Sequence, residues 1–519
     1  MRVIKRFSYV FLCLFGLGLA SSVSAQTVTC DTANGTRFNL EPRVNSVIQN
    51  SESVDFMLNR VSPGVDLLVG AAHDQRGDFR LFPGFSPDLR DGVYYVHRAG
   101  SNCAADFEGT LATLNGTVFT LGTPTVVADR ARDAFFLSDD ALGGAVVVGR
   151  TNAPTLLSTT KCPNGTHDFA HELTCWPVVN FVTFGNGEIL DPHMAVDERT
   201  SGTGAGDVYV ATQVENTANF PATSSVQIAA CTNATLVCST TPVVASGADT
   251  FGTHPYVQVR RDGIITLSYW TYTLPFNSTP PIPIEIKFVT CKPQGAPLPP
   301  VCSTPAVVAS SKTGGGFAPA AEGFEDFLFP QHTNRLEADG KTVTTFLIYD
   351  RCRALIGQAF LVPACSKVDV VLTTSVNNGA TWTAPTVVST AVGHHYMGAI
   401  RTDPSTNVVN IAYYSTEKDP FEQRSQIFLK QIEPGSTAVG AANILTSASN
   451  DPNSGIGDLT RNLSFGDINF GDRIGLAVAG NGTKGESRAY VHYTWNNVRG
   501  LSNGISQPDP NNTLVPFSY

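Results

Sequence analysis

Short hydrophobic runs separated by polar turns are the dominant pattern along this chain. The runs are rich in Val, Ile, Thr, Tyr and Phe, and clusters of Gly, Pro, Asn and Asp lie between them. Runs of this kind are typical of β-strands, and the clusters between them are typical of turns. Long stretches with the spacing of an amphipathic helix are absent. The pattern therefore predicts an all-β protein.

The same group of strands recurs along the sequence. Each group contains an inner strand that begins near a His, an Asp or a Phe, and the starts lie near residues 191, 254, 329 and 394. Another strand of the group has versions at 241–246, 304–310 and 384–389. Four strands per unit, repeated every 63 to 75 residues, predict the four-stranded blades of a β-propeller.

The number of blades follows from extending this pattern to both ends of the chain. Further inner strands are predicted at 54–60, 132–138 and 473–480. Seven blades are favoured, and six are the alternative because the first 130 residues fit the repeat least well. The last unit has only two evident strands, so we expect residues 37–48 to complete it and close the ring.

Residues 1–25 have the pattern of a secretory signal peptide. Arg2, Lys5 and Arg6 precede an apolar run at 7–20, and small residues follow at 23–25. The apolar run has about 14 residues, whereas a membrane-spanning helix needs about 20. We therefore expect residues 26–519 to form one propeller domain that is secreted or periplasmic and has no membrane anchor.

The cysteines support the same compartment. Ten of the 11 lie beyond the signal segment, an even number in a chain expected where disulfides persist. Their order suggests local pairs, although ten cysteines allow many other connectivities. The suggested pairs are Cys162 with Cys175, Cys231 with Cys238, Cys291 with Cys302, Cys352 with Cys365, and Cys30 with Cys103.

Charge narrows the choice of partner. Only 15% of the residues are charged and the formal net charge is -10. An acidic chain has little reason to bind the phosphate backbone of nucleic acid or an anionic membrane. We expect a monomer with no nucleic-acid partner.

The eight residues at 375–382 resemble the Asp-box (BNR) repeat of the sialidase superfamily, Ser-x-Asp-x-Gly-x-Thr-Trp. The matching positions are Ser375, Asn377, Gly379, Thr381 and Trp382, with Asn377 where the family has Asp. In such a turn a short polar side chain bonds the backbone, Gly adopts a positive φ and Trp covers the hairpin. The match lies between a third and a fourth strand, where the neighbouring units carry cysteine pairs. The resemblance implies a sialidase-like propeller.

The candidate site lies where the inner strands begin, because equivalent positions around a propeller converge on its axis. Aligning these strands places Asp191, His254, Phe329 and His394 at one level, and His193, Tyr256, Gln331 and Tyr396 two residues on. Arg335 lies near the same rim. The candidate catalytic residues are His193, His254, Tyr256, Arg335, His394 and Tyr396. Asp191, His193, His254 and His394 are candidate ligands of a divalent metal, and a purely structural role is the alternative for the whole set.

Three functions remain open for this set. The resemblance implies a secreted protein acting on extracellular glycan or glycoprotein through its axial funnel, as an exo-glycosidase of sialidase type. It also implies Tyr256 or Tyr396 as nucleophile, with Glu188, Glu325 or Glu337 as its partner. The alternatives are a non-catalytic propeller that binds glycan or protein, and a polysaccharide lyase in which His or Tyr abstracts a proton.

Overall fold

The computed structural model describes most of the chain between residues 38 and 518. The described ranges are 38–39, 49–63, 65–74, 92–98, 105–109, 111, 123–141, 144–166, 169–185, 187–216, 223–247, 249, 251–272, 283–311, 316–319, 326–327, 329–359, 362–446, 473–482, 487–502 and 505–518. The expected signal peptide at 1–25, and Cys30 and Cys103, lie outside these residues. Within the described residues, no helix is long and apolar enough to span a membrane.

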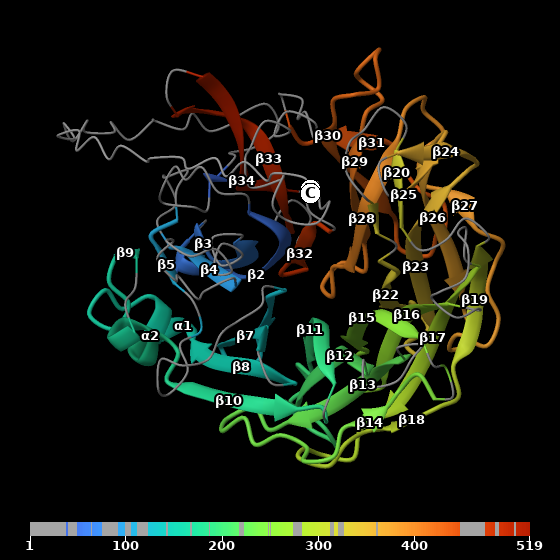
Figure 1. The fold of residues 1–519 in the computed structure, drawn as a ribbon. Helices are drawn as coiled ribbons and strands as arrows, with labels where there is room; N and C mark the ends of the chain where they lie inside the picture. Colours follow the sequence, from blue (N-terminus) through green and yellow to red (C-terminus); the bar gives the residue numbers. More distant parts are fainter. Residues whose placement is uncertain are drawn as a thin grey trace, which may run out of the picture.

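Antiparallel sheets arranged around a common axis make up most of the described chain (Figure 1). Seven sheets in this part of the chain form the ring, and we number them as blades I to VII in chain order, beginning with the sheet of β2. Their inner strands are β2, β6, β11, β15, β22, β28 and β32, which contact one another in this order and then close from β32 to β2. The prediction of an all-β propeller is confirmed.

Blades I and II contain the first strands of the ring. Blade I consists of β2 (Gln49–Ser62), β3 (Val65–Asp74), β4 (Gly92–His97), β5 (Phe107–Gly109) and the short β9 (Gly165–Thr166). Blade II consists of β6 (Thr125–Asp129), β7 (Ala134–Ala141), β8 (Ala145–Asn152) and β10 (Val178–Thr183). The predicted inner strand at 132–138 is therefore wrong, because β6 lies innermost and β7 is the second strand.

Blades III and IV follow the repeat closely. Blade III consists of β11 (Glu188–Val196), β12 (Val208–Asn216), β13 (Thr223–Cys231) and β14 (Val243–Val244). Blade IV consists of β15 (Gly252–Val259), β16 (Ile265–Tyr272), β17 (Ile284–Lys292), β18 (Val301–Cys302) and β19 (Ala306–Ser311), of which β18 and β19 both pair with β17.

Blades V and VI continue the ring. Blade V consists of β22 (Gln331–Leu336), β23 (Val343–Cys352), β26 (Val368–Ser375) and β27 (Thr386–Val387). Blade VI consists of β28 (His395–Thr402), β29 (Val409–Ser415), β30 (Gln426–Ile432) and β31 (Ala442–Ile444). A small separate sheet contains β20 (Gly316–Pro319), β21 (Asp326–Phe327), β24 (Leu355–Ala359) and β25 (Val362–Cys365).

Blade VII joins the two ends of the described chain. It consists of β32 (Gly475–Ala479), β33 (Arg488–Ser502), β34 (Ile505–Ser518) and β1 (Phe38–Asn39). Phe38 pairs with Leu514 in antiparallel register. The expectation that residues near 37–48 complete the last unit is confirmed for β1.

The hydrophobic core lies between neighbouring blades. For example, Phe136 and Val148 of blade II pack in one cluster with Met194 and Val210 of blade III. Strand β12 is buried at its first seven positions because neighbouring elements cover both of its faces. Packing between neighbouring blades therefore holds the inner strands in place around the axis.

The turn at 375–382 lies between β26 and β27, as the sequence predicts. The Oγ of Ser375 accepts a hydrogen bond from Gly379 N at 2.9 Å, and Asn377 Oδ1 accepts one from Thr381 N at 2.9 Å. The indole of Trp382 donates to Gly379 O at 2.9 Å. Gly379 has φ 81°, and a Cβ added there would lie 2.4 Å from the ring of Phe288. A glycine is therefore required at this contact with blade IV.

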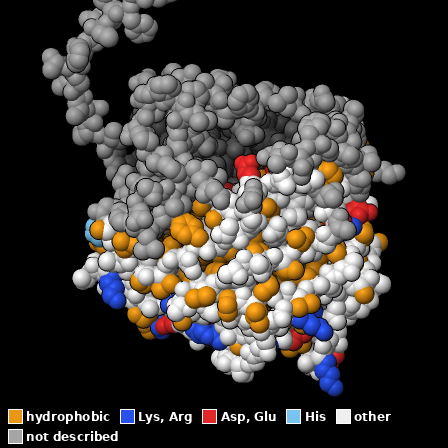
Figure 2. Space-filling view, turned by 60° about the horizontal axis from the view of Figure 1, so that its bottom comes forward, with side chains coloured by type: hydrophobic (Ala, Val, Ile, Leu, Met, Phe, Trp, Pro, Cys, Tyr) orange, Lys and Arg blue, Asp and Glu red, His pale blue; other side chains and the backbone are white. Residues whose placement is uncertain are grey.

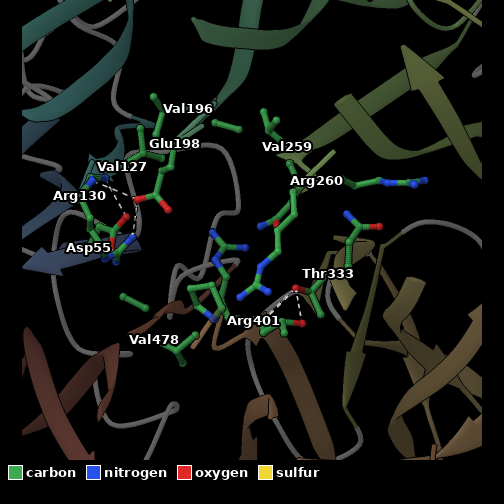
Figure 3. Close-up of a pocket in the computed structure, with 18 of the residues that line it drawn as sticks. Asp55, Val127, Arg130, Val196, Glu198, Val259, Arg260, Thr333, Arg401 and Val478 are labelled. Carbon is green, nitrogen blue, oxygen red and sulfur yellow. Dashed lines mark hydrogen bonds and ion pairs between the residues drawn. The ribbon is translucent and has the colours of Figure 1, made fainter. Parts of the chain in front are cut away.

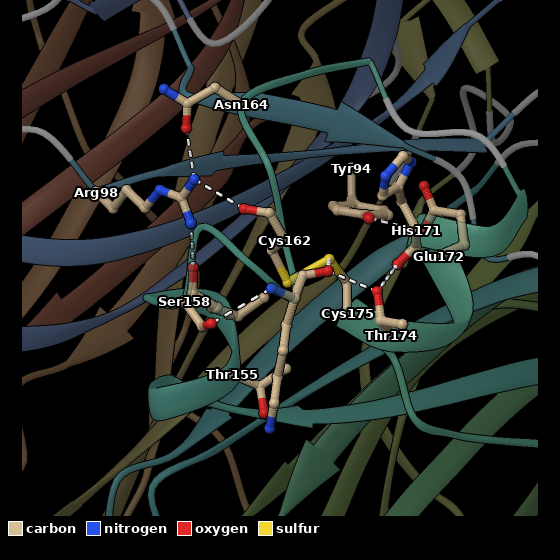
Figure 4. Close-up of a disulfide and its surroundings, with 12 residues drawn as sticks. Tyr94, Arg98, Thr155, Ser158, Cys162, Asn164, His171, Glu172, Thr174 and Cys175 are labelled. Atoms are coloured by element: carbon tan, nitrogen blue, oxygen red, sulfur yellow. Dashed lines mark hydrogen bonds between the residues drawn. A yellow bond between two sulfur atoms is a disulfide. The ribbon is translucent and has the colours of Figure 1, made fainter.

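Four disulfides are present in the described residues, and each matches a pair suggested by the order of the cysteines. Cys231–Cys238 and Cys291–Cys302 close the hairpins after the third strands of blades III and IV. Cys162–Cys175 lies between β8 and β10, next to the helices α1 (Ala153–Leu156) and α2 (Phe169–Cys175) (Figure 4). There Arg98 donates hydrogen bonds to Leu156 O at 2.7 Å and Cys162 O at 2.8 Å.

Replacing both Cys162 and Cys175 by serine is expected to lower the free energy of unfolding by about 2–4 kcal/mol. The crosslink joins residues 13 apart, and such a closure restricts the unfolded chain. Denaturant unfolding of the double variant and the wild type measures the difference. An unchanged midpoint under oxidising conditions would contradict this expectation.

Candidate functional site

A β-bulge recurs in the inner strands beside the axis. Pairing shifts between Leu190 and His193 in β11, between Thr253 and Tyr256 in β15, and between Tyr396 and Ala399 in β28. A residue with positive φ lies inside each shift: Asp191 at 50°, His254 at 49° and Met397 at 51°. Non-glycine residues rarely adopt this conformation. The bulges turn the residues that follow toward the axis.

The structure brings His193, His254 and Tyr256 together, as the sequence predicts. The rings of His193 and Tyr256 have centroids 4.2 Å apart, and those of His254 and Phe329 are 4.4 Å apart. Val257 N donates a hydrogen bond to His193 Nδ1 at 3.3 Å, and His254 Nδ1 forms an ion pair with Asp191. These side chains form a cluster across the axis, which we call the axial plug, and with them we include Gln331.

Burial and charge shift the ionisation of the axial plug. Burial, reinforced by the cations Arg401 and Arg473, holds the pKa of His193 well below its usual value. Burial raises the pKa of Asp191, but the His254 and Arg473 side chains outweigh it and the pKa is lowered overall. At neutral pH, His193 is therefore uncharged and Asp191 is an anion.

The cavity within the axial plug is small. His193, His254, Tyr256 and Gln331 line a space of about 30 Å³, which holds about one or two water molecules. A sugar ring does not fit there. A ligand larger than water therefore contacts the axial plug only from a neighbouring cavity.

His394 and Tyr396 lie away from the axial plug. His394 Nδ1 accepts a hydrogen bond from Val368 N at 3.2 Å, and its Nε2 lies 3.7 Å from the carboxylate of Glu422. Tyr396 is fully buried and stacks on Tyr414. The reason is register: the bulge of β28 places Met397, three residues after His394, at the position equivalent to Asp191 and His254.

Arg335 also points away from the axis. Its guanidinium donates to Glu433 O at 3.0 Å and Ser436 O at 2.7 Å, pairs with Glu337 at 2.9 Å, and lies over the ring of Phe346. These groups join blade V to blade VI. Arg335 and Glu337 therefore do not meet the predicted site residues.

The candidate metal ligands are not gathered into one site. Asp191 and His254 form their ion pair, and His193 faces Tyr256, whereas His394 lies at the boundary of blades V and VI. In the described part of the chain, no group of three or more His, Cys, Asp or Glu side chains is arranged to hold a metal ion.

A larger cavity lies where the inner strands end, on the other side of the axial plug. Its volume is about 460 Å³, which is in the range of small-molecule sites. Figure 3 shows Asp55, Arg130 and Glu198 on one wall and Arg260, Thr333 and Arg401 facing them. Residues from all seven inner strands line this cavity. We call it the axial cavity.

Arg401 lines both the axial plug and the axial cavity. Its guanidinium lies 4.9 Å from the centre of the Tyr256 ring, and burial lowers its pKa to about 10. Among the described residues, no carboxylate lies within ion-pair distance of it, whereas Arg130, Arg199 and Arg260 are each paired with an acid. At neutral pH Arg401 is a cation that has no ion-pair partner among the described residues, although the Asp55 carboxylate in the same cavity acts on its pKa.

Asp55, Arg130, Glu198 and Arg401 were not among the residues predicted from the sequence. A signal for them does exist, because charged residues follow the inner strands at 130, 197–199, 260–262 and 401. The predicted set came instead from the starts of these strands.

Comparison with known proteins finds solved structures that are similar to this chain but assigns it to no family. No family model matches the sequence, and no curated protein matches it. A crystal structure of a protein of unknown function from Dyadobacter fermentans DSM 18053 is 10% identical, with 93% of this chain and 98% of that chain covered and a TM-score of 0.39. The Hadza microbial sialidase Hz136 is 11% identical, with 88% and 77% covered and a TM-score of 0.40.

A third similar structure is AofleA from Arthrobotrys oligospora. It is 9% identical, with 76% of this chain and 88% of that chain covered and a TM-score of 0.38. Because all three TM-scores are below 0.5, these similarities do not bear on function.

Proposed function

We propose that this protein binds an extracellular glycan in the axial cavity, with an anionic group of the sugar against Arg401. The observation that carries this proposal is that Arg401 has no ion-pair partner among the described residues. A partly buried cation is stabilised by an ion-pair partner, and a carboxylate or sulfate supplied by a ligand provides the pair. The Tyr256 ring beneath the guanidinium holds it in place.

The rest of the axial cavity suits a sugar. Glu198 and Asp55 are acceptors for sugar hydroxyl groups, while Thr333 and Asn334 offer both donors and acceptors. A few convergent polar groups on a partly apolar wall are characteristic of small-ligand sites.

Four disulfides support a secreted or periplasmic location, where glycans are accessible. The signal-like segment and a single domain over 26–519 are part of this proposal. The hydrogen-bonded turn at 375–382 supports a relationship to the sialidase superfamily.

Arg401→Met tests the proposal. Calorimetric titration with sialosides, uronate oligosaccharides and neutral oligosaccharides is expected to show binding of an anionic glycan by the wild type. The variant is expected to bind it about 10- to 100-fold more weakly, because a charge-assisted hydrogen bond contributes about 1.5–3 kcal/mol.

Arg424→Met is the matched control, because Arg424 is exposed and outside the axial cavity. It is expected to bind like the wild type. Equal binding by Arg401→Met, or a preference for neutral glycans, would overturn the proposal.

A further inference from the structure

Asp55 and Glu198 are two carboxylates held on one wall of the axial cavity by the same arginine. Asp55 lies on β2, Glu198 follows β11, and Arg130 follows β6 between them (Figure 3). Arg130 pairs with Asp55 and lies 3.2 Å from Glu198 Oε1. Three neighbouring blades thus fix the spacing of the two acids.

The two carboxylates differ in their surroundings. Asp55 accepts hydrogen bonds from Phe56 N and Ala128 N, both at 2.8 Å, in addition to its ion pair. Glu198 accepts its hydrogen bonds through Oε1, from Arg130 N at 3.1 Å and from the Arg130 side chain. Within the described residues its Oε2 accepts none, so this oxygen is available to a ligand.

Burial raises the pKa of Glu198, although Arg130 opposes the shift. A carboxyl group with a raised pKa keeps a proton closer to neutral pH, which suits a general acid. Asp55 is fixed by main-chain donors and keeps one lone pair of Oδ2 for a further donor.

We propose that Glu198 and Asp55 hydrolyse a glycosidic bond of the glycan bound beside Arg401. This inference rests on the proposed function. Asp55 attacks the anomeric carbon while Glu198 donates its proton to the glycosidic oxygen, so the bond from that oxygen to the anomeric carbon breaks and a glycosyl ester of Asp55 forms. The Glu198 carboxylate then takes a proton from a water molecule, whose oxygen adds to the anomeric carbon and releases the Asp55 carboxylate. Both residues thereby return to their starting states, as in hydrolases whose two carboxyl groups lie close together.

The experiment measures turnover and binding separately. The probes are glycosides of the anionic sugar that binds best, one with a 4-nitrophenyl leaving group and one with a methyl leaving group. Glu198→Gln is expected to lower kcat/KM on the methyl glycoside about 10²- to 10⁴-fold, with less loss of kcat/KM on the 4-nitrophenyl glycoside, whose leaving group needs little protonation. The dissociation constant is expected to stay within about threefold.

Two further variants keep the test decisive if Glu198→Gln unfolds. Glu198→Asp keeps the charge beside Arg130 but withdraws the acid, and it is expected to lose kcat/KM mainly on the methyl glycoside. Asp55→Asn removes the nucleophile and is expected to lose turnover of both probes. Asp262→Asn is the control, since Asp262 pairs with Arg260 from outside the axial cavity, and it is expected to keep wild-type kcat.

The outcomes separate the two proposals. Wild-type binding of an anionic glycan without turnover would overturn the hydrolytic role and leave glycan binding intact. Equal losses on both leaving groups in Glu198→Gln would show that Glu198 is not the acid. Failure of the wild type to bind any anionic glycan would overturn the proposed function itself.

Discussion

Replacing Arg335 by methionine is expected to lower the free energy of unfolding by about 3–5 kcal/mol. The side chain is 2% exposed and connects β22 of blade V to the loop after β30 of blade VI. Methionine fills part of the space but leaves the carbonyls of Glu433 and Ser436 without their donor. It also leaves the carboxylate of Glu337, whose side chain is 19% exposed, without its cation.

Arg60→Met is the matched control for this prediction. Arg60 pairs with Asp133, but both side chains are more than a third exposed, and exposed pairs contribute about 0–1 kcal/mol. Denaturant unfolding followed by tryptophan fluorescence compares the two variants. If Arg335→Met is as stable as Arg60→Met, the contacts between blades V and VI do not have the importance assigned to them.

Stability is expected to fall as the pH drops from 6.5 toward 4, because several histidines are buried without charge. His332 is fully buried, with Nδ1 2.8 Å from Ser268 Oγ and Nε2 2.8 Å from Thr266 Oγ1. Burial lowers its pKa to about 3, and it lowers the pKa of His492 to about 4.

The direction of this pH dependence follows from the protonation of histidine in the unfolded and the folded protein. An unfolded histidine takes up a proton near pH 6.5, whereas these two folded histidines remain neutral until the pH reaches about 3 to 4. Their contribution is therefore fully present above pH 6.5 and is lost as the pH falls toward their folded pKa values. Each histidine contributes a slope of about 1.4 kcal/mol per pH unit within that window.

His332→Gln isolates one of these slopes. The glutamine amide can donate to and accept from the two hydroxyl groups, and it does not titrate. Between pH 7 and 5 the unfolding free energy of this variant is expected to fall less steeply than that of the wild type. The difference corresponds to about one proton fewer taken up on unfolding. His171→Gln on the partly exposed helix α2 is the control. Parallel curves for His332→Gln and the wild type would contradict the expectation.

The repeat and the cysteine pairs could be predicted because they are local in sequence. The pair Cys231–Cys238 closes a hairpin whose two strands adjoin it, so sequence order alone suggests it. The repeated Pro and Val runs gave the blade unit in the same way. That residues near 37–48 add a strand to the last unit was also predictable, because an incomplete unit needs one more strand, but the partner strand β34 was not predicted.

The site could be predicted only in part, because bulges change register without changing composition. The alternation of side chains along a strand does not reveal where a bulge interrupts it. In β28 the bulge lies at Met397 and not at His394. The proximity of His193, His254 and Tyr256 could be predicted because their bulges coincide with the apparent alignment. Arg401 was not predicted, because its lack of an ion-pair partner among the described residues depends on the arrangement of all seven blades.

The surface view shows where charge and apolar side chains gather on one side of the ring (Figure 2). Lys and Arg side chains lie toward its lower rim, among Asp and Glu side chains and scattered hydrophobic ones. Apart from this view, ion pairs connect successive blades, such as Arg60 with Asp133 and Arg488 with Asp66.

The pairing of β1 with β34 has a consequence for the order of folding. This contact joins opposite ends of the described chain, so it cannot form until β34 has been synthesised. Contacts between distant residues also slow folding, because the chain between them must first be ordered. Blades I to VI are therefore expected to assemble as an open arc, and closing that arc in blade VII is the slow step.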